Sequence, residues 1–276
     1  IRDSYRFFVV EFSNIDQFDH YFTFGKSEIR SFTYSLQSRL VSLVKKPLFK
    51  NSFKRPLTEM NRHTYDFGVI GNCAFTAHIH KNTNIVWMCW PRFDSSFIFG
   101  SLVDEEKGGE FSVIPCEPNA SFNQYYIENT NVLCTEVEAA DGKFRVTDFA
   151  PRFYQNDRYY KPLMMVRKIE PIQGNPRIKV ECEPRGDYGK IIPEQSQGSN
   201  HIRFLGLEGH VRLTTNIPLT YVMEDEAFVL NETKYLVFTS GPPLEAPLVA
   251  TVESFLSRTI SYWRNWVKTT SIYDFY

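Results

Sequence analysis

The feature that most constrains the fold is a series of short segments, from Tyr65 onward, in which hydrophobic and polar residues alternate. One example is a stretch in which Ala77 and Ile79 alternate with His78 and His80. Because successive side chains of a β-strand point to opposite faces of the sheet, a period of two is typical of half-buried strands. Many such segments, separated by Gly, Pro, Asn and Asp, predict an all-β fold, a large antiparallel β-sandwich.

The same pattern locates the individual strands, and a change of period near the end of the chain predicts a helix. Hydrophobic residues recur there at i, i+3 and i+4, which predicts an amphipathic helix at about residues 248–268. Ala140, Asp141 and Gly142 indicate a tight turn between two of the strands. The expected strands are residues 69–80, 85–90, 109–114, 121–127, 132–139, 143–149, 163–170, 177–183, 202–205, 211–215, 219–223, 227–230 and 235–240.

Composition divides the chain at Met60, the first methionine. Residues 1–59 contain no Ala, Cys or Trp, although they contain nine Phe. We expect them to be an extension that is disordered or translated from upstream of a start at Met60, with a packed appendage or a basic targeting segment as alternatives. Residues 60–248 are the expected sandwich domain, and 249–276 the expected linker helix.

Charge and cysteine usage narrow the class of protein. A net charge of −1 gives no reason to expect nucleic acid or an anionic membrane surface as a partner. No apolar run approaches the roughly 20 residues that cross a bilayer. Five cysteines without paired spacing favour a reducing cytoplasm and free, mostly buried thiols. We expect no cofactor and no metal.

Several segments resemble one family. Residues 85–100, I-V-W-M-C-W-P-R-F-D-S-S-F-I-F-G, and the preceding residues 65–73 resemble the opening of bacterial and archaeal glycoside hydrolase family 15 proteins, the glucoamylase and trehalase relatives. Three further segments are similar to that family in the same order. They are V-T-D-F-A-P-R at 146–152, M-V-R-K-I-E-P-I-Q-G at 165–174 with P-R-G-D-Y-G at 184–189, and Y-W-R-N-W at 262–266. Trp90 and Gly186 depart from the family's usual residues.

The resemblance implies a particular domain arrangement. In this family a supersandwich-like β domain precedes an (α/α)6 barrel, whose glutamic acid pair hydrolyses α-glucosidic bonds with inversion. The resemblance therefore implies that this chain stops before its catalytic barrel, and no catalytic residue is assigned within it. The implied partners are that barrel and, for the whole protein, an α-glucan or trehalose.

Candidate site residues lie in two places. Trp90, Arg92 and Asp94 follow an expected strand, where they could rim the sugar site or contact the barrel, although an Arg92–Asp94 ion pair could instead fix the loop. The expected helix would present a barrel-facing surface that includes Val252, Trp263 and Trp266. Weaker aromatic candidates are Tyr159 and Tyr160, while Trp87 is expected in the core, and Arg152 and Arg185 are expected to be solvated or paired.

Two other clusters contain residue types found in catalytic or metal sites, but their sequence context argues against such sites. Residues 104–106 with Glu110 offer carboxylates, but Lys107, Gly108 and Gly109 make the segment a solvated turn rather than the paired acids of a glycosidase. The residue types of Cys73, His78, His80 and Cys89 suit zinc, but their spacing does not, and we expect the two cysteines to be core thiols.

Two functional hypotheses follow, and a purely structural role for the chain is a third reading. The first is a non-catalytic N-terminal sandwich that supports and partly rims the catalytic barrel of a glucoamylase- or trehalase-type hydrolase. The alternative is a free-standing carbohydrate-binding module for α-glucans, which would need an exposed aromatic platform.

Overall fold

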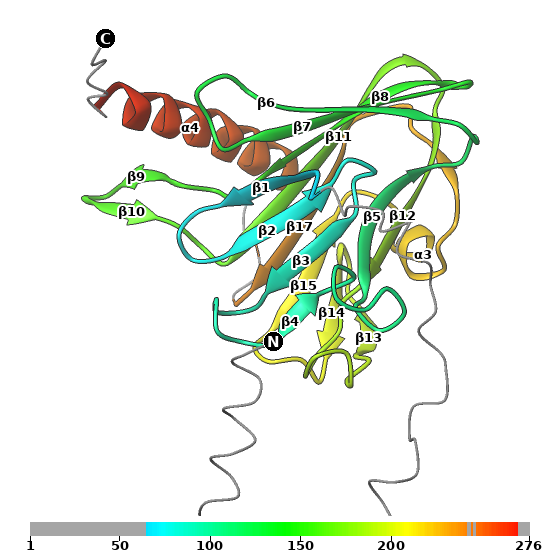
Figure 1. Ribbon diagram of the computed structural model, residues 1–276, viewed down its shortest axis with the longest axis horizontal. Coiled ribbons are helices and arrows are strands. Elements are labelled where there is room, and N and C mark those ends of the chain that lie inside the picture. The colour runs from blue at the N-terminus through cyan, green and yellow to red at the C-terminus, as the bar shows by residue number, and fades with distance from the viewer. Residues whose placement is uncertain (1–64, 242–243, 245–246, 270–276) are drawn as a thin grey trace, which may run out of the picture. The chain divides into compact units, whose positions relative to one another are not determined.

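The computed structural model describes residues 65–241, 244 and 247–269, which belong to the unit Thr64–Tyr276. The expectations for residues 1–59 lie outside the described residues. An eight-stranded antiparallel sheet dominates the fold (Figure 1). Its strands, in spatial order, are β13 (Glu194–Gln197), β14 (His201–Leu205), β15 (Val211–Thr215), β17 (Lys234–Ser240), β11 (Met164–Gly174), β8 (Gly142–Phe149), β7 (Leu133–Ala139) and β6 (Ser121–Tyr126).

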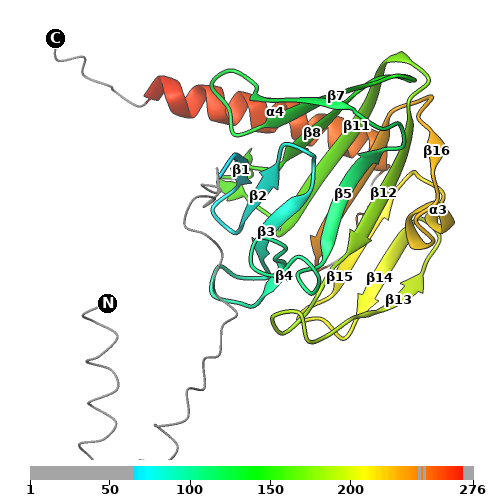
Figure 2. The ribbon, with the colours of Figure 1, turned by 45° about the vertical axis from the view of Figure 1, so that its right-hand side comes forward.

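Smaller sheets form the second layer, which packs on the inner face of the large sheet (Figure 2). One contains β1 (Phe67–Gly71), β2 (Thr76–His80), β3 (Ile85–Cys89) and β4 (Phe97–Phe99) in that order. Another contains β16 (Phe228–Val229), β12 (Arg177–Glu183) and β5 (Glu110–Pro115). The hairpin of β9 (Phe153–Gln155) and β10 (Arg158–Tyr160) extends from the sandwich. The helices among the described residues are α3 (Leu219–Met223) and α4 (Leu248–Thr269). This architecture confirms the predicted all-β sandwich with a C-terminal helix.

Helix α4 lies across the outer face of the large sheet, so the central strands are buried on both faces (Figures 1 and 2). In β11, Met165 faces the inner core, whereas Met164 and Val166 pack in the outer cluster with Val252 of α4. Double burial explains why this strand is hydrophobic along most of its length instead of strictly alternating. Glu253 fixes the helix further, because it accepts a hydrogen bond from Tyr235 (2.8 Å) and pairs with Lys168 (2.8 Å).

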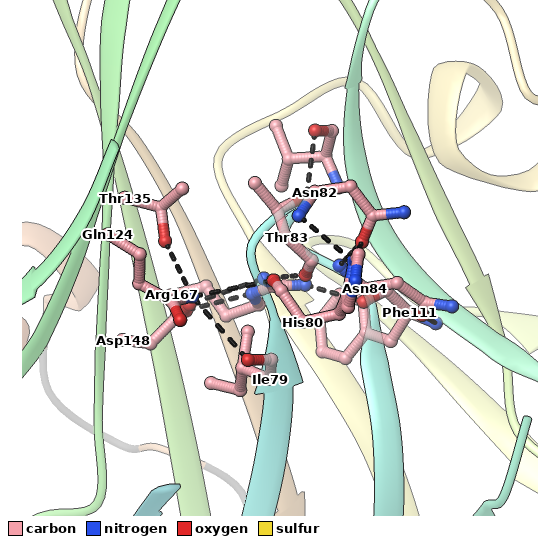
Figure 3. Close-up of polar contacts among 11 residues, drawn as sticks. Ile79, His80, Asn82, Thr83, Asn84, Phe111, Gln124, Thr135, Asp148 and Arg167 are labelled. Carbon is pink, nitrogen blue, oxygen red and sulfur yellow. Dashed lines mark hydrogen bonds and ion pairs between the residues drawn. The ribbon is translucent and has the colours of Figure 1, made fainter. Parts of the chain in front are cut away.

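A buried ion pair joins the two layers (Figure 3). Arg167 of β11 donates from Nε to Asp148 Oδ1 of β8 (2.8 Å), and both side chains are 0% exposed. The same guanidinium donates to the backbone carbonyl of Phe111 (2.6 Å) in β5 and to that of Thr83 in the β2–β3 turn. Burial raises the pKa of Asp148, and the adjacent Arg167 opposes that rise. Carboxylate and carbonyl oxygens thus solvate a guanidinium that lies entirely within the protein.

The structure corrects three sequence-based expectations. Residues 219–223 form helix α3 instead of a strand: Pro218 precedes them, and Leu219 and Val222 are buried at helical i, i+3 spacing. The expected strand at 69–80 divides into β1 and β2 around Cys73, whose φ is 66°. Strands β4, β9, β10 and β13 were not predicted, because three or four residues are too few to reveal a period.

The cysteines are less buried than expected. All five are free, and Cys134 and Cys182 are buried, but Cys73 and Cys116 are exposed. Cys73 occupies an exposed turn, so the expectation that it is a core thiol is wrong. Among the helices of the described residues, none has the length and apolar character needed to cross a membrane.

Removing the guanidinium from the buried pair should destabilise the protein strongly. Arg167→Met leaves the Asp148 carboxylate buried without a counter-charge, and we expect a loss of about 3–5 kcal/mol in the free energy of unfolding. Urea denaturation followed by circular dichroism measures it. The matched control is Arg92→Met, which removes an exposed ion pair and should leave the free energy of unfolding nearly unchanged. Equal losses of stability in the two variants would contradict the conclusion that the buried Arg167–Asp148 pair holds the two layers together.

A surface charge network on β7 and β8 should make stability depend on pH. Hydrogen bonds from Lys143, Arg145 and Tyr125 lower the pKa of Glu136 from 4.5 to about 2. A folded-state pKa below the unfolded value means that the stabilisation is complete above about pH 5 and is lost as the pH falls toward 2.

We therefore expect Glu136→Gln to cost about 1 kcal/mol at pH 7 and to lose less stability than the wild type on acidification to pH 2.5. Glu138→Gln is the control, because Glu138 is exposed on the same strand and makes no ion pair within the described residues. Urea titrations at the two pH values test this. Parallel losses of stability in the wild type and Glu136→Gln would refute it.

Candidate functional site: the cleft beside helix α4

A hollow with aromatic walls lies between α4 and the β9–β10 hairpin, which extends beside the helix (Figure 1). The hairpin pairs Tyr159 with Tyr154 in antiparallel register, so the two rings meet edge to face with centroids 5.5 Å apart. The cleft has a volume of about 480 Å³, and the residues that line it are Phe153, Tyr154, Tyr159, Ser257, Arg258, Ser261, Tyr262, Asn265, Trp266 and Thr269.

Arg152, at the start of the hairpin, ties the cleft to the sandwich. Its Nε donates to the Tyr262 hydroxyl of α4 (2.8 Å), and its Nη1 donates to the carbonyl of Asn72 (2.6 Å). The guanidinium also lies over the rings of Tyr159 (5.4 Å) and Tyr262 (5.1 Å), a cation–π arrangement. The backbone N–H of Arg152 donates to Thr259 Oγ1 of α4 (3.2 Å). One residue therefore connects the β1–β2 turn, the hairpin and the helix.

Arg258 provides the reciprocal connection from the helix to the hairpin. Its guanidinium lies 3.8 Å from the centroid of the Phe153 ring, donates to Gln155 Oε1 (3.0 Å) and donates to the carbonyl of Tyr154 (3.3 Å). From the sequence, Arg152 was expected only to be solvated or paired, and its role in joining the helix to the hairpin was not predicted. Arg258 was not among the candidate residues. The sequence did contain one signal for the role of Arg152, because this residue directly precedes the aromatic residues Phe153 and Tyr154.

The cleft exposes large aromatic surfaces. Tyr154 is 58% exposed, Tyr159 is 56% exposed and Trp266 is 52% exposed. Trp263 is half-buried, with its ring 5.1 Å from Tyr262 and 6.0 Å from Trp266. A concentration of exposed aromatic side chains beside a helix is typical of a surface that contacts a partner or a ligand.

The three residues expected on the barrel-facing side of the helix do not share one environment. Trp266 lines the cleft and the ring of Trp263 lies beside that of Trp266, but Val252 is 1% exposed and packs in the outer-face cluster with Phe149 and Val237. The expectation for Val252 is therefore wrong, because the large sheet of this chain already covers it. The apolar face of α4 is divided between its own sandwich and the open cleft.

The β3–β4 loop places Trp90, Arg92 and Asp94 in different environments as well. Trp90 is 3% exposed, and its ring contacts Phe75 (5.0 Å) and Phe238 (5.6 Å). This burial corrects the expectation that its face could stack on a sugar. Arg92 donates to both oxygens of Asp94 (2.9 and 3.1 Å), and both side chains are exposed. The pair links two positions of the loop at the surface.

The remaining clusters show structural roles. Asp104 Oδ1 accepts hydrogen bonds from the backbone N–H groups of Glu106 (3.1 Å) and Lys107 (2.9 Å), which closes the predicted turn. His78 and His80 share one face of β2, whereas Cys73 lies in the exposed turn before it. Over the described ranges, no three His, Cys, Asp or Glu side chains converge as a metal site would require.

Comparisons with known proteins agree on the class of domain. The fold is an antiparallel β-sandwich domain with a helix on its outer face, and residues 56–227 match the family described as "Trehalase-like, N-terminal". The match covers more than half of the chain, so the chain belongs to this family of trehalase-like N-terminal domains. This confirms the resemblance to the trehalase relatives that the sequence segments indicate.

Curated relatives are similar over much of the chain. Trehalase 1 of Sulfolobus acidocaldarius is 30% identical over 207 residues, which cover 73% of this chain and 34% of the relative. The trehalase of Thermoplasma acidophilum is 27% identical over 209 residues, which cover 72% of this chain and 35% of the relative. The chain thus spans about a third of the length of these relatives. No solved structure gives a significant match.

Loss of Arg152 should loosen the helix without unfolding the sandwich. Arg152→Met removes hydrogen bonds from a charged donor, each of which contributes about 1.5–3 kcal/mol. We expect amide hydrogens of residues 259–269 to exchange about tenfold faster, measured by hydrogen–deuterium exchange. Lys268→Met is the control, because Lys268 is exposed on the same helix and makes no ion pair in the part of the chain that is described. Unchanged exchange in Arg152→Met would show that Arg152 does not hold the helix.

Proposed function

We propose that this chain is the non-catalytic N-terminal domain of an inverting glycoside hydrolase that acts on trehalose. The observation that carries the proposal is the match of residues 56–227 to the trehalase-like N-terminal family. The similar proteins that are named are trehalases, and this chain corresponds to about a third of their length. These facts support trehalose as the substrate of the whole protein, ahead of a glucoamylase-type α-glucan.

The proposed role of the chain is to support a catalytic (α/α)6 domain through the cleft beside α4. Tyr154, Tyr159 and Trp266 expose aromatic surface there, and burying it against a neighbour would be favourable. Thr269, the last residue of α4, also lines the cleft. A domain that follows the helix in the chain would therefore meet this surface first.

Two further parts of the proposal concern the β3–β4 loop and the cellular compartment of the whole protein. The exposed Arg92–Asp94 pair is proposed to contribute to the rim of the sugar site, where both charges could meet sugar hydroxyls. The whole protein is proposed to act in the cytoplasm. The free and exposed thiols of Cys73 and Cys116 support this, since they are suited to a reducing environment.

One observation favours the alternative function, a carbohydrate-binding module for α-glucans. Tyr154 and Tyr159 present exposed rings on one hairpin, and aromatic faces suit the apolar faces of hexoses. The two functions differ in what the isolated chain does. A binding module would bind maltooligosaccharides saturably in calorimetry, and a domain that contacts a catalytic partner would not.

The interface assignment can be tested in the whole protein, which contains the catalytic domain. We expect Trp266→Ala to lower the melting temperature and the trehalase activity of the whole protein, and to lower the melting temperature of the isolated chain by less. Val229→Ala is the control, because Val229 is 45% exposed on β16, outside the cleft. The isolated chain should release no glucose from trehalose or maltose.

Two results would overturn the proposal. Glucose release by the purified chain, at a rate that scales with its concentration, would place catalysis within these residues. A Trp266→Ala variant of the whole protein that matches both the wild type and Val229→Ala would remove the cleft from the interface. Saturable binding of maltooligosaccharide that Tyr159→Ala abolishes would favour the binding module.

A further inference from the structure

Two arginines lie opposite each other near the edge of the large sheet that β13, β14 and β15 form (Figures 1 and 2). Arg203 of β14 and Arg212 of β15 are register partners in an antiparallel pair, so their side chains leave the same face of the sheet. That face is the outer one, because their neighbours along the strands, among them Phe204 and Leu213, lie in the inner core. The apolar cluster beneath α4 includes none of the described residues of β13, β14 or β15. The apolar side of the helix therefore packs on the central strands and not on the arginines.

Neither arginine has a counter-charge in the described part of the chain. No ion pair or hydrogen bond joins either side chain to another described residue. Glu194 of β13 and Glu208 in the β14–β15 turn are carboxylates on adjoining segments, and neither forms an ion pair with Arg203 or Arg212. Like charges directly opposite each other destabilise a sheet. A position of this kind suits negative charge that comes from outside the chain.

The donors that a ligand can reach are the terminal nitrogens of the two guanidinium groups. Arg203 is exposed and Arg212 is half-buried. Of the Arg212 guanidinium nitrogens, Nε is enclosed without an acceptor, whereas the two Nη atoms, which also lack an acceptor among the described residues, are open to solvent. Ser196 lies opposite Arg203, and Thr239 lies opposite Arg212. Two hydroxyl groups thus flank the two guanidinium groups in one row across four strands, and the row contains no carboxylate.

The environment of His201 agrees with an excess of positive charge on this face. His201 precedes Arg203 by two residues, so the two side chains share one face of β14. Burial lowers the pKa of His201, and the positive charges of Arg212 and Arg203 lower it further. The electrostatic potential of the surface therefore favours an anion.

The number of donors indicates the class of anion. A carboxylate has two oxygens and one charge, which a single guanidinium satisfies in bidentate fashion. A phosphate group carries a charge of about −1.5 to −2 at pH 7 and three acceptor oxygens, so it can accept from two opposed guanidinium groups at once.

A hollow on the same hairpin limits the size of the ligand. Its volume is about 340 Å³, near the lower end of the roughly 300–1,000 Å³ of small-molecule pockets. The residues that line it are Arg203, Phe204, Leu205, Gly206, Leu207, Gly209, His210, Val211 and Arg212. Both arginines belong to this set, and the set contains no carboxylate. A small molecule with a phosphate group fits these dimensions and charges.

We propose that Arg203 and Arg212 bind the phosphate group of a small molecule on the outer face of β14 and β15. The Nη atoms of both guanidinium groups donate hydrogen bonds to the phosphate oxygens. Inorganic phosphate and a phosphate monoester such as a sugar phosphate offer this chemistry alike, and the experiment below separates them. The site is distinct from the cleft beside α4 and does not rest on the proposed function.

The test is a calorimetric titration of the full 276-residue chain with inorganic phosphate, glucose 6-phosphate and D-glucose, in a phosphate-free buffer at pH 7. We expect the two phosphate compounds to bind saturably and to compete with each other. Arg203→Gln and Arg212→Gln should each weaken this binding about tenfold or more, because each removes a charged hydrogen-bond donor. Tighter binding of glucose 6-phosphate would identify an ester as the ligand, and equal or tighter binding of inorganic phosphate would identify the free anion.

The matched control is Arg177→Gln, which removes the same charge from an exposed position on β12 in the other layer. It should bind both phosphate compounds as the wild type does. Arg203 is exposed and its removal relieves the repulsion from Arg212, so Arg203→Gln should fold as the wild type does, which melting curves check. The test therefore stays decisive if Arg212→Gln is unstable.

Four results would overturn the proposal. They are the absence of saturable binding of both phosphate compounds, binding of D-glucose as tight as that of glucose 6-phosphate, unchanged binding in Arg203→Gln, and a loss of binding in Arg177→Gln that equals the loss in Arg203→Gln. None of these results would affect the α4 contact, because Trp266→Ala tests that contact separately.

Discussion

The arrangement of the two layers depends on the buried ion pair between Asp148 and Arg167. A guanidinium without water needs acceptors in fixed places, and here the large sheet supplies the carboxylate while β5 and the β2–β3 turn supply carbonyls. A shift of one layer against the other would leave a charge buried and unsatisfied, at a cost of several kcal/mol. Hydrophobic packing tolerates small displacements more easily, so the polar contact specifies the register.

Both candidate surfaces follow from that register. With the inner face of the large sheet committed to the second layer, its outer face is left for α4, which packs over Phe149, Val166 and Val237. The end of the helix then lies beside the β9–β10 hairpin and forms the aromatic cleft. The apolar side of the helix packs on the central strands, and the outer face of β14 and β15 carries Arg203 and Arg212.

Alternation and helical periodicity predicted most of the architecture, because burial on one face leaves a regular trace in the sequence. The hydrophobic pattern was least informative for short elements, such as α3. It was also uninformative about which part of the molecule covers a given apolar side chain. Val252 looked like a contact for another domain since a helix period shows which face is apolar and not what covers it. Trp90 looked accessible for a similar reason, as a residue at the end of a strand can turn inward.

Local periodicity and short motifs are properties of neighbouring residues, so they were enough to predict the class of fold, the position of the long helix and the family resemblance. Only the folded structure shows that Arg167 is the buried centre of the sandwich and that Arg152 joins the helix to the hairpin. It also shows that the ring of Trp90 packs against Phe75 and Phe238. These roles depend on contacts between residues far apart in the chain, and no local pattern records such distances.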